Sequence, residues 1–407
     1  MMKMKVKRKK TTLLVFMLLM LTNAVVIGEI VKGQVKTAAS LNWPGDSWVD
    51  TDPADQGMNN STIYDMYDYI DTNSLNVHSV SIVRNGFLVH EEYLINNQLR
   101  SGDDYGPGHP GDQVINETLH VQYSATKTII GLLIGIAIDK GFIDNVSQTF
   151  ESFFPELTYL TNQPLITIEH LLTMMSGIYG DGSLVWDRTL QEILVENLWS
   201  PPGTTFEYSS TSTHLLSAII NRTYGEKTSE FAQDNLFDPI GISRDDWAWQ
   251  ENSEGYSFGG YGLWFTPQAM SRIGLLMLNN GNWNGTQVIS ENWMIEMGTP
   301  HSPQGYYGYL VWMTKYAYAA NGLGGQVIFI IPEHNMTVIF TAAIIYSSPD
   351  PHYIYIIDNF IIGAIVIPQS PDPGIPGYSL IVFIPMMIVG IVFISKKMKN
   401  KSSQIVK

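Results

Sequence analysis

The stretch QYSATKTII, residues 122–130, places a serine and a lysine three positions apart at the start of an apolar run. The run predicts a helix from about Ser124 to about Lys140. On a helix, residues i and i+3 share one face, so the Ser124 hydroxyl and the Lys127 amine are expected to lie side by side. The start of a helix also supplies unpaired backbone N–H groups and a partial positive charge.

This pairing has a chemical interpretation and a plainer alternative. An apolar environment disfavours the ammonium form, so Lys127 can act as the base for a Ser124 nucleophile. The backbone N–H of Ser124 would then be placed to bind an oxyanion. The alternative is a helix-capping serine followed by a solvated lysine. Because S-x-x-K matches are common, the stretch alone favours the capping alternative, and other motifs must decide.

Two later segments supply such motifs. FEYSSTSTHLL, residues 206–216, places Tyr208 just before a predicted helix, and a tyrosine beside a lysine can relay a proton. ANGLGGQVIFIIP, residues 320–332, places a glycine turn before a predicted strand. Glycines let the backbone approach a bound group closely, although an ordinary turn at the entry of a strand has the same sequence.

In this order the motifs resemble those of the serine β-lactamase and penicillin-binding-protein-like hydrolases. The family pattern is S-x-x-K, then Y-x-N or Y-S-x, then K-T-G or a glycine-rich equivalent. The matching positions are Ser124–Lys127, Tyr208–Ser210 and Gly322–Gly325. Framework segments at 166–178, 258–285 and 307–313 are also similar, and the likeness covers residues 78 to 345.

The resemblance implies roles for these residues. Ser124 would be the nucleophile, with Lys127 and Tyr208 as acid–base groups. The expected oxyanion and substrate contacts come from Ser124 itself, Ser210 and the turn residues Gly322, Leu323, Gly324 and Gly325, with Leu323 as the second oxyanion donor. Ser210 stands where class C β-lactamases have asparagine, and the third motif has no lysine. These departures favour the esterase and 6-aminohexanoate-dimer hydrolase branch over a true β-lactamase.

The implied fold is α/β, more narrowly α+β. A five-stranded antiparallel sheet is flanked by helices, with an all-helical region inserted. The residue patterns agree, since residues 78–95 predict a hairpin around Asn85-Gly86 and residues 324–343 predict two strands. Helices are predicted at 61–73, 166–178, 210–225, 266–281 and 351–366.

Composition limits the possible functions. The chain of 407 residues has a net charge of −15 and no cysteine. Its lysines and arginines gather at the two ends, so the middle is more acidic still, which argues against nucleic-acid binding. Solubility is the simpler explanation of this acidity, and an acidic functional patch is the alternative. Disulfides and thiolate sites are excluded, and the nine histidines show no metal-binding spacing. We therefore expect no metal or cofactor.

The two ends of the sequence predict where in the cell the protein is located. A basic start and the apolar residues 13–27 predict an export signal within residues 1–38, either cleaved or kept as an anchor. A hydrolase domain at 39–366 and a Pro-rich linker at 367–376 follow. Residues 377–395 carry no charge and predict a transmembrane helix, and the lysine-rich tail 396–407 is expected to be cytoplasmic. This predicts a single-pass protein of the cell membrane with its catalytic domain outside.

Three functions remain open from the sequence. The first is a serine esterase or amidase that acts on a small ester, amide or peptide-like substrate. The second is a β-lactamase or a D-Ala-D-Ala-type peptidase, and stable acylation by a penicillin would favour it. The third is a non-catalytic surface protein that uses the same fold for binding.

Overall fold

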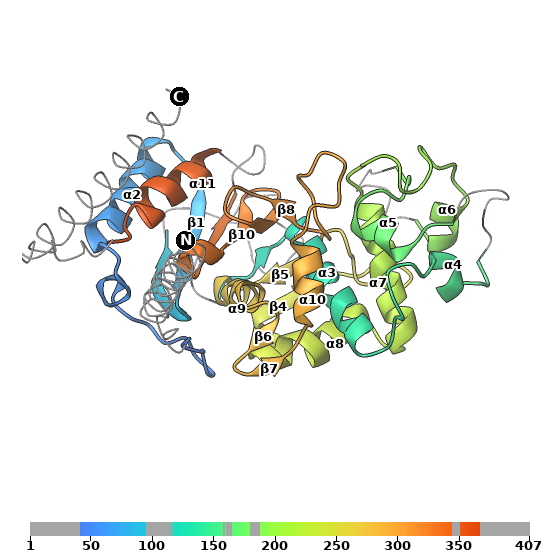
Figure 1. The fold of residues 1–407 in the computed structure, drawn as a ribbon, viewed down its shortest axis with the longest axis horizontal. Coiled ribbons are helices and arrows are strands. Elements are labelled where there is room, and N and C mark those ends of the chain that lie inside the picture. Colours follow the sequence, from blue (N-terminus) through green and yellow to red (C-terminus); the bar gives the residue numbers. More distant parts are fainter. Residues whose placement is uncertain are drawn as a thin grey trace, which may run out of the picture. The chain divides into compact units, whose positions relative to one another are not determined.

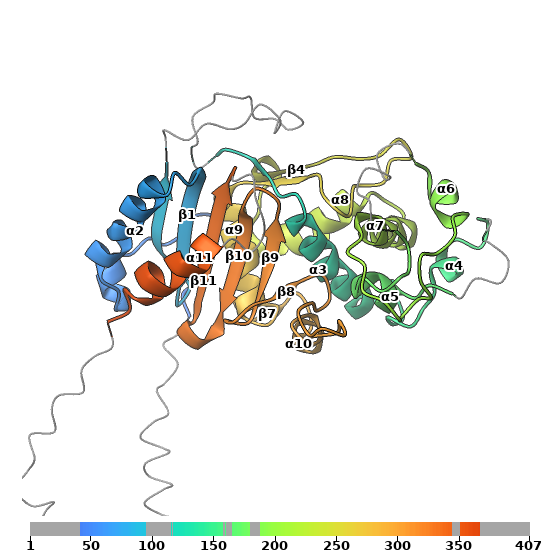
Figure 2. The same ribbon diagram turned by 90° about the horizontal axis from the view of Figure 1, so that it is seen from above.

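The computed structural model describes residues 41–94, 115, 117–157, 159, 165–179, 188–343 and 351–366. The main sheet joins the two ends of this region (Figure 2). Its strands, in spatial order, are β2 (Phe87–Tyr93), β1 (Val77–Arg84), β11 (Met336–Ala342), β10 (Gln326–Ile331), β9 (Tyr318–Gly322) and β8 (Trp312–Met313). All of its neighbouring strands are antiparallel. The β1–β11 pair therefore connects the N-terminal hairpin to the C-terminal strands.

The prediction of five strands was one too few, since the described part of this sheet has six. The additional strand, β8, consists of two residues only. A strand this short shows no alternation of apolar and polar residues, so periodicity cannot detect it. The hairpin predicted at Asn85-Gly86 is confirmed, with Val83 opposite Leu88 and both tip residues at positive φ.

Helices cover both faces of the sheet. α9 (Pro267–Leu278) packs on one face, where an added Cβ at Gly274 would lie 3.0 Å from Ile328. On the other face, Tyr353 of α11 (Pro351–Ile356) stacks on Phe340 of β11 with ring centroids 4.3 Å apart. Figure 2 shows these two helices on opposite sides of the strands. The sheet is thus buried on both faces, which explains its nearly continuous apolar strands.

Most of the remaining helices lie on the same side of the sheet as the helix α3, residues 125–139 (Figures 1 and 2). They are α2 (Asn60–Thr72), which lies beside α11, then α3 (Ala125–Asp139), α4 (Phe150–Phe153), α5 (Ile168–Leu172), α6 (Leu190–Leu194), α7 (Ser210–Tyr224), α8 (Thr228–Ala232) and α10 (Glu291–Met297). Two π-helical turns, Gln233–Phe237 and Ile357–Ile362, continue α8 and α11. Short strands complete the set: β3 (His120–Val121), β4 (Trp247–Trp249), β5 (Leu263–Phe265), β6 (Asn282–Trp283) and β7 (Thr286–Gln287).

Most helix predictions are confirmed, and two were too long. The helix expected over 351–366 ends, with its π-helical turn, at Ile362. The helix expected over 166–178 ends at Leu172. Met174 and Gly177 have φ values of 57° and 77°, a left-handed conformation that cannot continue an α-helix. The apolar stripe therefore extended beyond the helix because the following turn is buried as well.

No helix among the described residues is both long and apolar enough to cross a bilayer. The expected export signal at 13–27 and membrane helix at 377–395 lie outside the described residues.

Helix α3 is buried on all sides. Every residue from Ala125 to Ala137 is buried, as expected of a helix whose surface is apolar all round. α10 lies against it (Figure 1), and the Trp293 indole donates to the Gly131 carbonyl oxygen at 3.0 Å. An added Cβ at Gly135 would lie 2.2 Å from the Trp293 ring. The glycine is thus required by packing, in a position where helix propensity disfavours it.

Gly135→Ala is expected to lower the free energy of unfolding by about 1–3 kcal/mol, because the added methyl group overpacks the contact with Trp293. Intrinsic propensity has the opposite sign, since alanine favours a helix over glycine by about 1 kcal/mol. Denaturant unfolding of parent and variant measures the balance. In a Trp293→Leu background the same change should be stabilising, and an equal loss in both backgrounds would contradict the packing explanation.

Candidate active site

Ser124 stands at the junction between a short strand and α3. β3 pairs with β5, and the Gln122 N–H donates to the Leu263 carbonyl oxygen at 2.7 Å. Tyr123 then takes a φ of +43°, which turns the chain into the helix. Such a conformation is uncommon for a bulky residue. It places Ser124 at the first turn, where its side chain makes no capping hydrogen bond.

Lys127 is buried, with a relative exposure of 1%, so the alternative of a capping serine and a solvated lysine is wrong. Its Nζ donates to three oxygens, which are Ser124 Oγ at 3.2 Å, Ser210 Oγ at 3.1 Å and the Gly260 carbonyl oxygen at 2.7 Å. Burial without a carboxylate partner lowers the pKa of Lys127 to about 7. The predicted Ser–Lys pair is therefore present, with an amine that is substantially neutral near neutral pH.

The neutral form of Lys127 has a defined arrangement. A neutral amine keeps two N–H donors and gains one lone pair. The Gly260 carbonyl can only accept, so one N–H is committed to it. When the second N–H is donated to Ser210, the lone pair faces the Ser124 hydroxyl, which lies 3.2 Å away. The contacts are thus compatible with either protonation state, and the neutral state is that of a base aimed at Ser124.

Gly260 reaches Lys127 because two adjacent glycines let their loop approach α7 closely. An added Cβ at Gly259 would lie 2.0 Å from the Thr213 carbonyl oxygen, and one at Gly260 would lie 2.5 Å from the Ser210 Cβ. Because these two glycines have no side chains, the loop can contact the helix closely.

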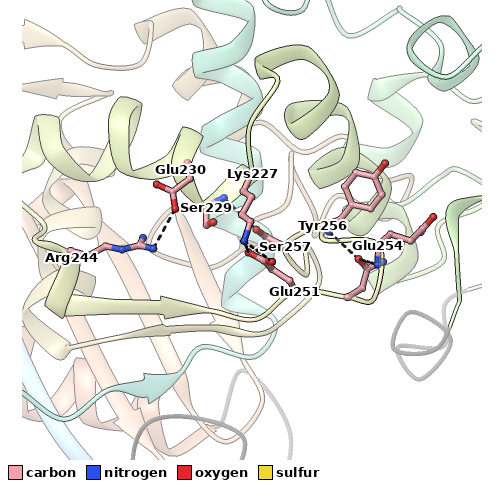
Figure 3. Close-up of polar contacts among 9 residues, drawn as sticks. Lys227, Ser229, Glu230, Arg244, Glu251, Glu254, Tyr256 and Ser257 are labelled. Carbon is pink, nitrogen blue, oxygen red and sulfur yellow. Dashed lines mark hydrogen bonds and ion pairs between the residues drawn. The ribbon is translucent and has the colours of Figure 1, made fainter.

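The segment that precedes Gly260 is held by polar contacts, some of which Figure 3 shows. Lys227 Nζ lies 2.9 Å from a carboxylate oxygen of Glu251, and the Ser229 N–H donates to Ser257 Oγ at 3.3 Å. Glu254 accepts from the Leu190 N–H at 2.8 Å, at the start of α6. These contacts hold the segment 251–257, which leads into Gly260.

Tyr208 lies beside the pair. Its segment is held by the buried turn after α5, since the Glu207 N–H donates to the Met174 carbonyl oxygen at 2.8 Å. Lys127 Nζ is 4.8 Å from the centroid of the Tyr208 ring. Burial of the phenol raises the pKa of Tyr208 to about 12 and outweighs the polar influence of the Ser124 and Trp312 side chains, which lowers it. The phenol is therefore protonated at neutral pH.

Ser210 lies beside the Lys127 amine at the start of α7. It is the first residue of α7, after the capping residue Ser209, whose side chain accepts from the Ser212 N–H. The Ser210 hydroxyl lies against Lys127 Nζ. In the described site it is therefore a neighbour of the amine.

The glycine turn, residues 322–325, joins β9 to β10 and approaches the start of α3. An added Cβ at Gly322 would lie 2.1 Å from the Gln122 carbonyl oxygen and 3.3 Å from the Ala125 backbone nitrogen. Gly324 and Gly325 have φ values of +82° and +98°, and the Leu323 side chain is 58% exposed. The turn thus brings main-chain atoms next to the residues that flank Ser124.

The site combines all the predicted elements, and two further residues complete it. Gly260 and Trp312 both contact it, and sequence reasoning assigned neither of them. The Gly259-Gly260 pair was a visible signal. Trp312 lies in one of the framework segments, which indicated likeness but no role. Among the residues that the structure describes, no group of three or more His, Asp or Glu side chains could hold a metal ion.

The family model for Beta-lactamase matches residues 42–355, which is most of the chain. The chain belongs to the beta-lactamase family. It is 24% identical over 269 residues to the 6-aminohexanoate-dimer hydrolase of Paenarthrobacter ureafaciens, covering 57% of this chain and 67% of that protein. The expected class, a serine hydrolase related to the beta-lactamases, is therefore confirmed.

Solved structures share the fold of this beta-lactamase-family chain. A family VIII carboxylesterase superimposes with a TM-score of 0.59 at 15% identity, covering 74% of this chain and 96% of that one. FmtA from Staphylococcus aureus superimposes with a TM-score of 0.57 at 15% identity, covering 78% and 92% of the two chains. Identities this low establish the architecture only.

Replacing Lys127 by methionine tests the burial of the amine. In the folded parent the pKa of Lys127 is about 7, against an ordinary value of 10.5 in the unfolded chain. Between these values the unfolded chain binds more protons. The free energy of unfolding therefore rises with pH, by up to about 1.4 kcal/mol per pH unit from this group.

Denaturant unfolding at about pH 7.5 and about pH 9.5 measures this increment. We expect Lys127→Met to lose up to about 2 kcal/mol of the increase that the parent shows between the two pH values. Lys140→Met, at the exposed end of the same helix, is the matched control and should keep it. Equal increments in the parent and in Lys127→Met would show that the amine does not titrate in this window.

Proposed function

We propose that this beta-lactamase-family protein hydrolyses an ester or amide through an acyl-enzyme on Ser124. The observation that carries the proposal is the Lys127 amine, buried without a carboxylate partner and 3.2 Å from Ser124 Oγ. A buried amine costs stability, so packing alone does not explain why this position carries a lysine. Its chemistry as a base accounts for its presence.

In the first step, Ser124 Oγ bonds to the substrate carbonyl carbon while neutral Lys127 takes the hydroxyl proton. The carbonyl oxygen becomes an oxyanion, held by the backbone N–H groups of Ser124 and Leu323. The proposed donors lie on the two segments that meet where an added Cβ at Gly322 would lie 2.1 Å from the Gln122 carbonyl oxygen. Their rigidity matters, since an oxyanion site acts by being organised in advance.

In the second step, the bond to the leaving group breaks and the leaving oxygen or nitrogen takes a proton from Tyr208. The Lys127 ammonium returns its proton to the phenol. A water molecule then attacks the acyl carbon and gives one proton to neutral Lys127. The bond between the acyl carbon and Ser124 Oγ breaks, and Ser124 Oγ takes the proton back from Lys127 as the acid leaves. The pKa values of about 7 and about 12 mean that at neutral pH much of Lys127 is neutral and Tyr208 is protonated, which are the forms these two roles need.

An ester or amide without a carboxylate beside the scissile bond is the favoured substrate. The third motif, at 322–325, carries glycines and an exposed leucine and no lysine that could bind a carboxylate. The names of the relatives agree, since they include a 6-aminohexanoate-dimer hydrolase and a carboxylesterase. The second candidate is a β-lactamase or a D-Ala-D-Ala-type peptidase, which the family itself keeps in consideration.

A fluorophosphonate probe tests the nucleophile. The parent is expected to gain one adduct by intact mass and to lose p-nitrophenyl ester turnover with it, whereas Ser124→Ala gains none. Ser61→Ala, an exposed serine on α2, is the control and should label like the parent. Adducts of equal size on parent and Ser124→Ala would exclude Ser124. A folded parent that neither labels nor turns over would support a binding protein.

The same mass measurement with benzylpenicillin separates the two hydrolase candidates. An ester hydrolase without the carboxylate-binding lysine should show no long-lived penicilloyl adduct at concentrations that acylate penicillin-binding proteins. A stable adduct on Ser124 would favour the second candidate.

We also propose that residues 377–395 anchor the protein in the cell membrane with the hydrolase domain outside. The support is the uncharged stretch of membrane-spanning length with lysines after it, together with the export signal predicted at residues 13–27.

Cell fractionation tests the anchor. The full chain should sediment with membranes and resist extraction by alkaline carbonate, whereas a chain that ends at residue 370 should not. Protease added to intact cells should remove the hydrolase domain. Equal distribution of both chains, or protection of the domain from protease, would refute the proposed attachment.

A further inference from the structure

The glycine turn that carries the proposed oxyanion donor is closed by its own backbone. The Gly325 N–H donates to the Gly322 carbonyl oxygen at 3.2 Å, so Leu323 and Gly324 take the two central positions. At one end, an added Cβ at Gly322 would lie 2.1 Å from the Gln122 carbonyl oxygen, which fixes this end beside the chain that leads to the nucleophile. The position of the Leu323 N–H therefore depends on what holds the other end, at Gly325.

The ladder between β10 and β11 does not hold that end. Its register begins with Val327 opposite Phe340, so Gly325 lies outside the paired residues. A side chain occupies the next place along the ladder. The Gln326 amide oxygen accepts from the Ala342 N–H at 3.4 Å, and the Gln326 amide N–H donates to the Ala342 carbonyl oxygen. The main chain of β11 is thus satisfied there by a side chain, and the Gly325 carbonyl takes a partner from elsewhere.

That partner is Tyr353 of α11. Its hydroxyl donates to the Gly325 carbonyl oxygen at 3.1 Å. The side chain is fully buried, and its ring stacks on Phe340 with centroids 4.3 Å apart and an angle of 8° between the rings. An added Cβ at Gly325 would lie 2.2 Å from the hydroxyl oxygen, and the φ of this residue is +98°, so the contact requires a glycine.

A turn of this composition needs an external hold. Glycine adopts many backbone conformations, and both Gly324 and Gly325 have positive φ. An oxyanion site, in contrast, acts only if its donors are organised in advance. The stacking on Phe340 would be equally available to a phenylalanine at position 353, so packing alone does not account for the hydroxyl group. Its hydrogen bond to Gly325 does.

We propose that Tyr353 is a positioning residue for the oxyanion site. By holding the Gly325 carbonyl it fixes the far end of the glycine turn, while Gly322 is fixed at the near end, and the Leu323 N–H is kept in place between them. This role rests on the proposed function and deepens it, because it assigns the residue that organises an oxyanion donor. A helix close to the end of the hydrolase domain thereby contributes to catalysis without contacting the substrate.

The test uses Tyr353→Phe in the full-length protein, with p-nitrophenyl butyrate as substrate. The inhibitor is 1,1,1-trifluoropentan-2-one, which carries the same propyl group and adds to the serine as a tetrahedral oxyanion. Acylation and deacylation both pass through an oxyanion, so kcat responds whichever step is slower. Rates are expressed per active site, titrated by the fluorophosphonate adduct, so that loss of folded protein is not counted as loss of catalysis.

We expect kcat to fall about 10-fold while KM stays within about twofold, since the affected interaction is made in the transition state. The loss is smaller than the roughly 100- to 1,000-fold of a deleted oxyanion donor, because the donor is loosened and not removed. The Ki of the ketone should rise by a similar factor, because its adduct resembles the transition state. A merely structural role would leave Ki and the rate per active site unchanged.

Matched variants separate the hydrogen bond from the space that the hydroxyl fills. At position 353, 4-methylphenylalanine keeps the size without the donor, and should reproduce the losses even if phenylalanine disturbs folding. There 4-aminophenylalanine keeps a donor and should retain parent values. Tyr318→Phe is the control. Its buried hydroxyl donates to the Met277 carbonyl oxygen at 3.3 Å, at the other end of β9, and the variant should act like the parent.

Each contrary outcome overturns the inference. A lower active fraction with unchanged kcat and Ki would mean that Tyr353 stabilises the fold only. A lower kcat with unchanged Ki would mean that the oxyanion site is unaffected. Equal losses with 4-aminophenylalanine and 4-methylphenylalanine would mean that the hydrogen bond is not responsible. A parent that neither turns over the ester nor labels would remove the proposed function itself, which is seen before any variant is compared.

Discussion

The burial of one amine determines the rest of the site. Lys127 lies in the first turn of a helix that is buried on every side, and no carboxylate among the described residues forms an ion pair with it, so its charge is disfavoured. The amine is still tolerated because three oxygens surround it, from Ser124, Ser210 and Gly260. A buried polar group with its hydrogen bonds satisfied costs far less than one without them. The helix therefore supplies the desolvation, and its neighbours supply the partners.

The Gly260 loop and the 322–325 turn reach the site through close backbone approaches. The Gly260 carbonyl reaches Lys127 because Gly259 and Gly260 lie against α7, and the 322–325 turn reaches Ser124 because Gly322 lies against Gln122. At each of these glycines a Cβ would lie 2.5 Å or less from its nearest neighbour. The site is thus assembled from three segments, far apart in sequence, that meet through glycines. Substitution there would alter the position of catalytic groups and not only the stability of the fold.

Much of this could be predicted from the sequence, for physical reasons. Local chemistry dictates the S-x-x-K spacing and the Asn85-Gly86 turn. It also dictates the start of α9, where Thr266 caps the helix and Pro267 is its first residue. The sixth strand and the early end of the helix at Leu172 were not predictable, because tertiary contacts decide them. The same holds for Gly260 and Trp312. Their roles arise from what lies opposite them, and no spacing within one segment encodes it.

The pairing of β1 with β11 has a consequence for the time at which activity can arise. β9 and β10, which carry the glycine turn, join the sheet through β11, and β11 is held by a strand from the opposite end of the domain. Contacts between such distant segments are slow to form, because their loop-closure entropy must be overcome first. A nascent chain that already contains Ser124, Lys127 and Tyr208 still lacks the turn at 322–325 and the strand β11 that holds it in the sheet. The complete site can therefore form only after synthesis has reached the last strand.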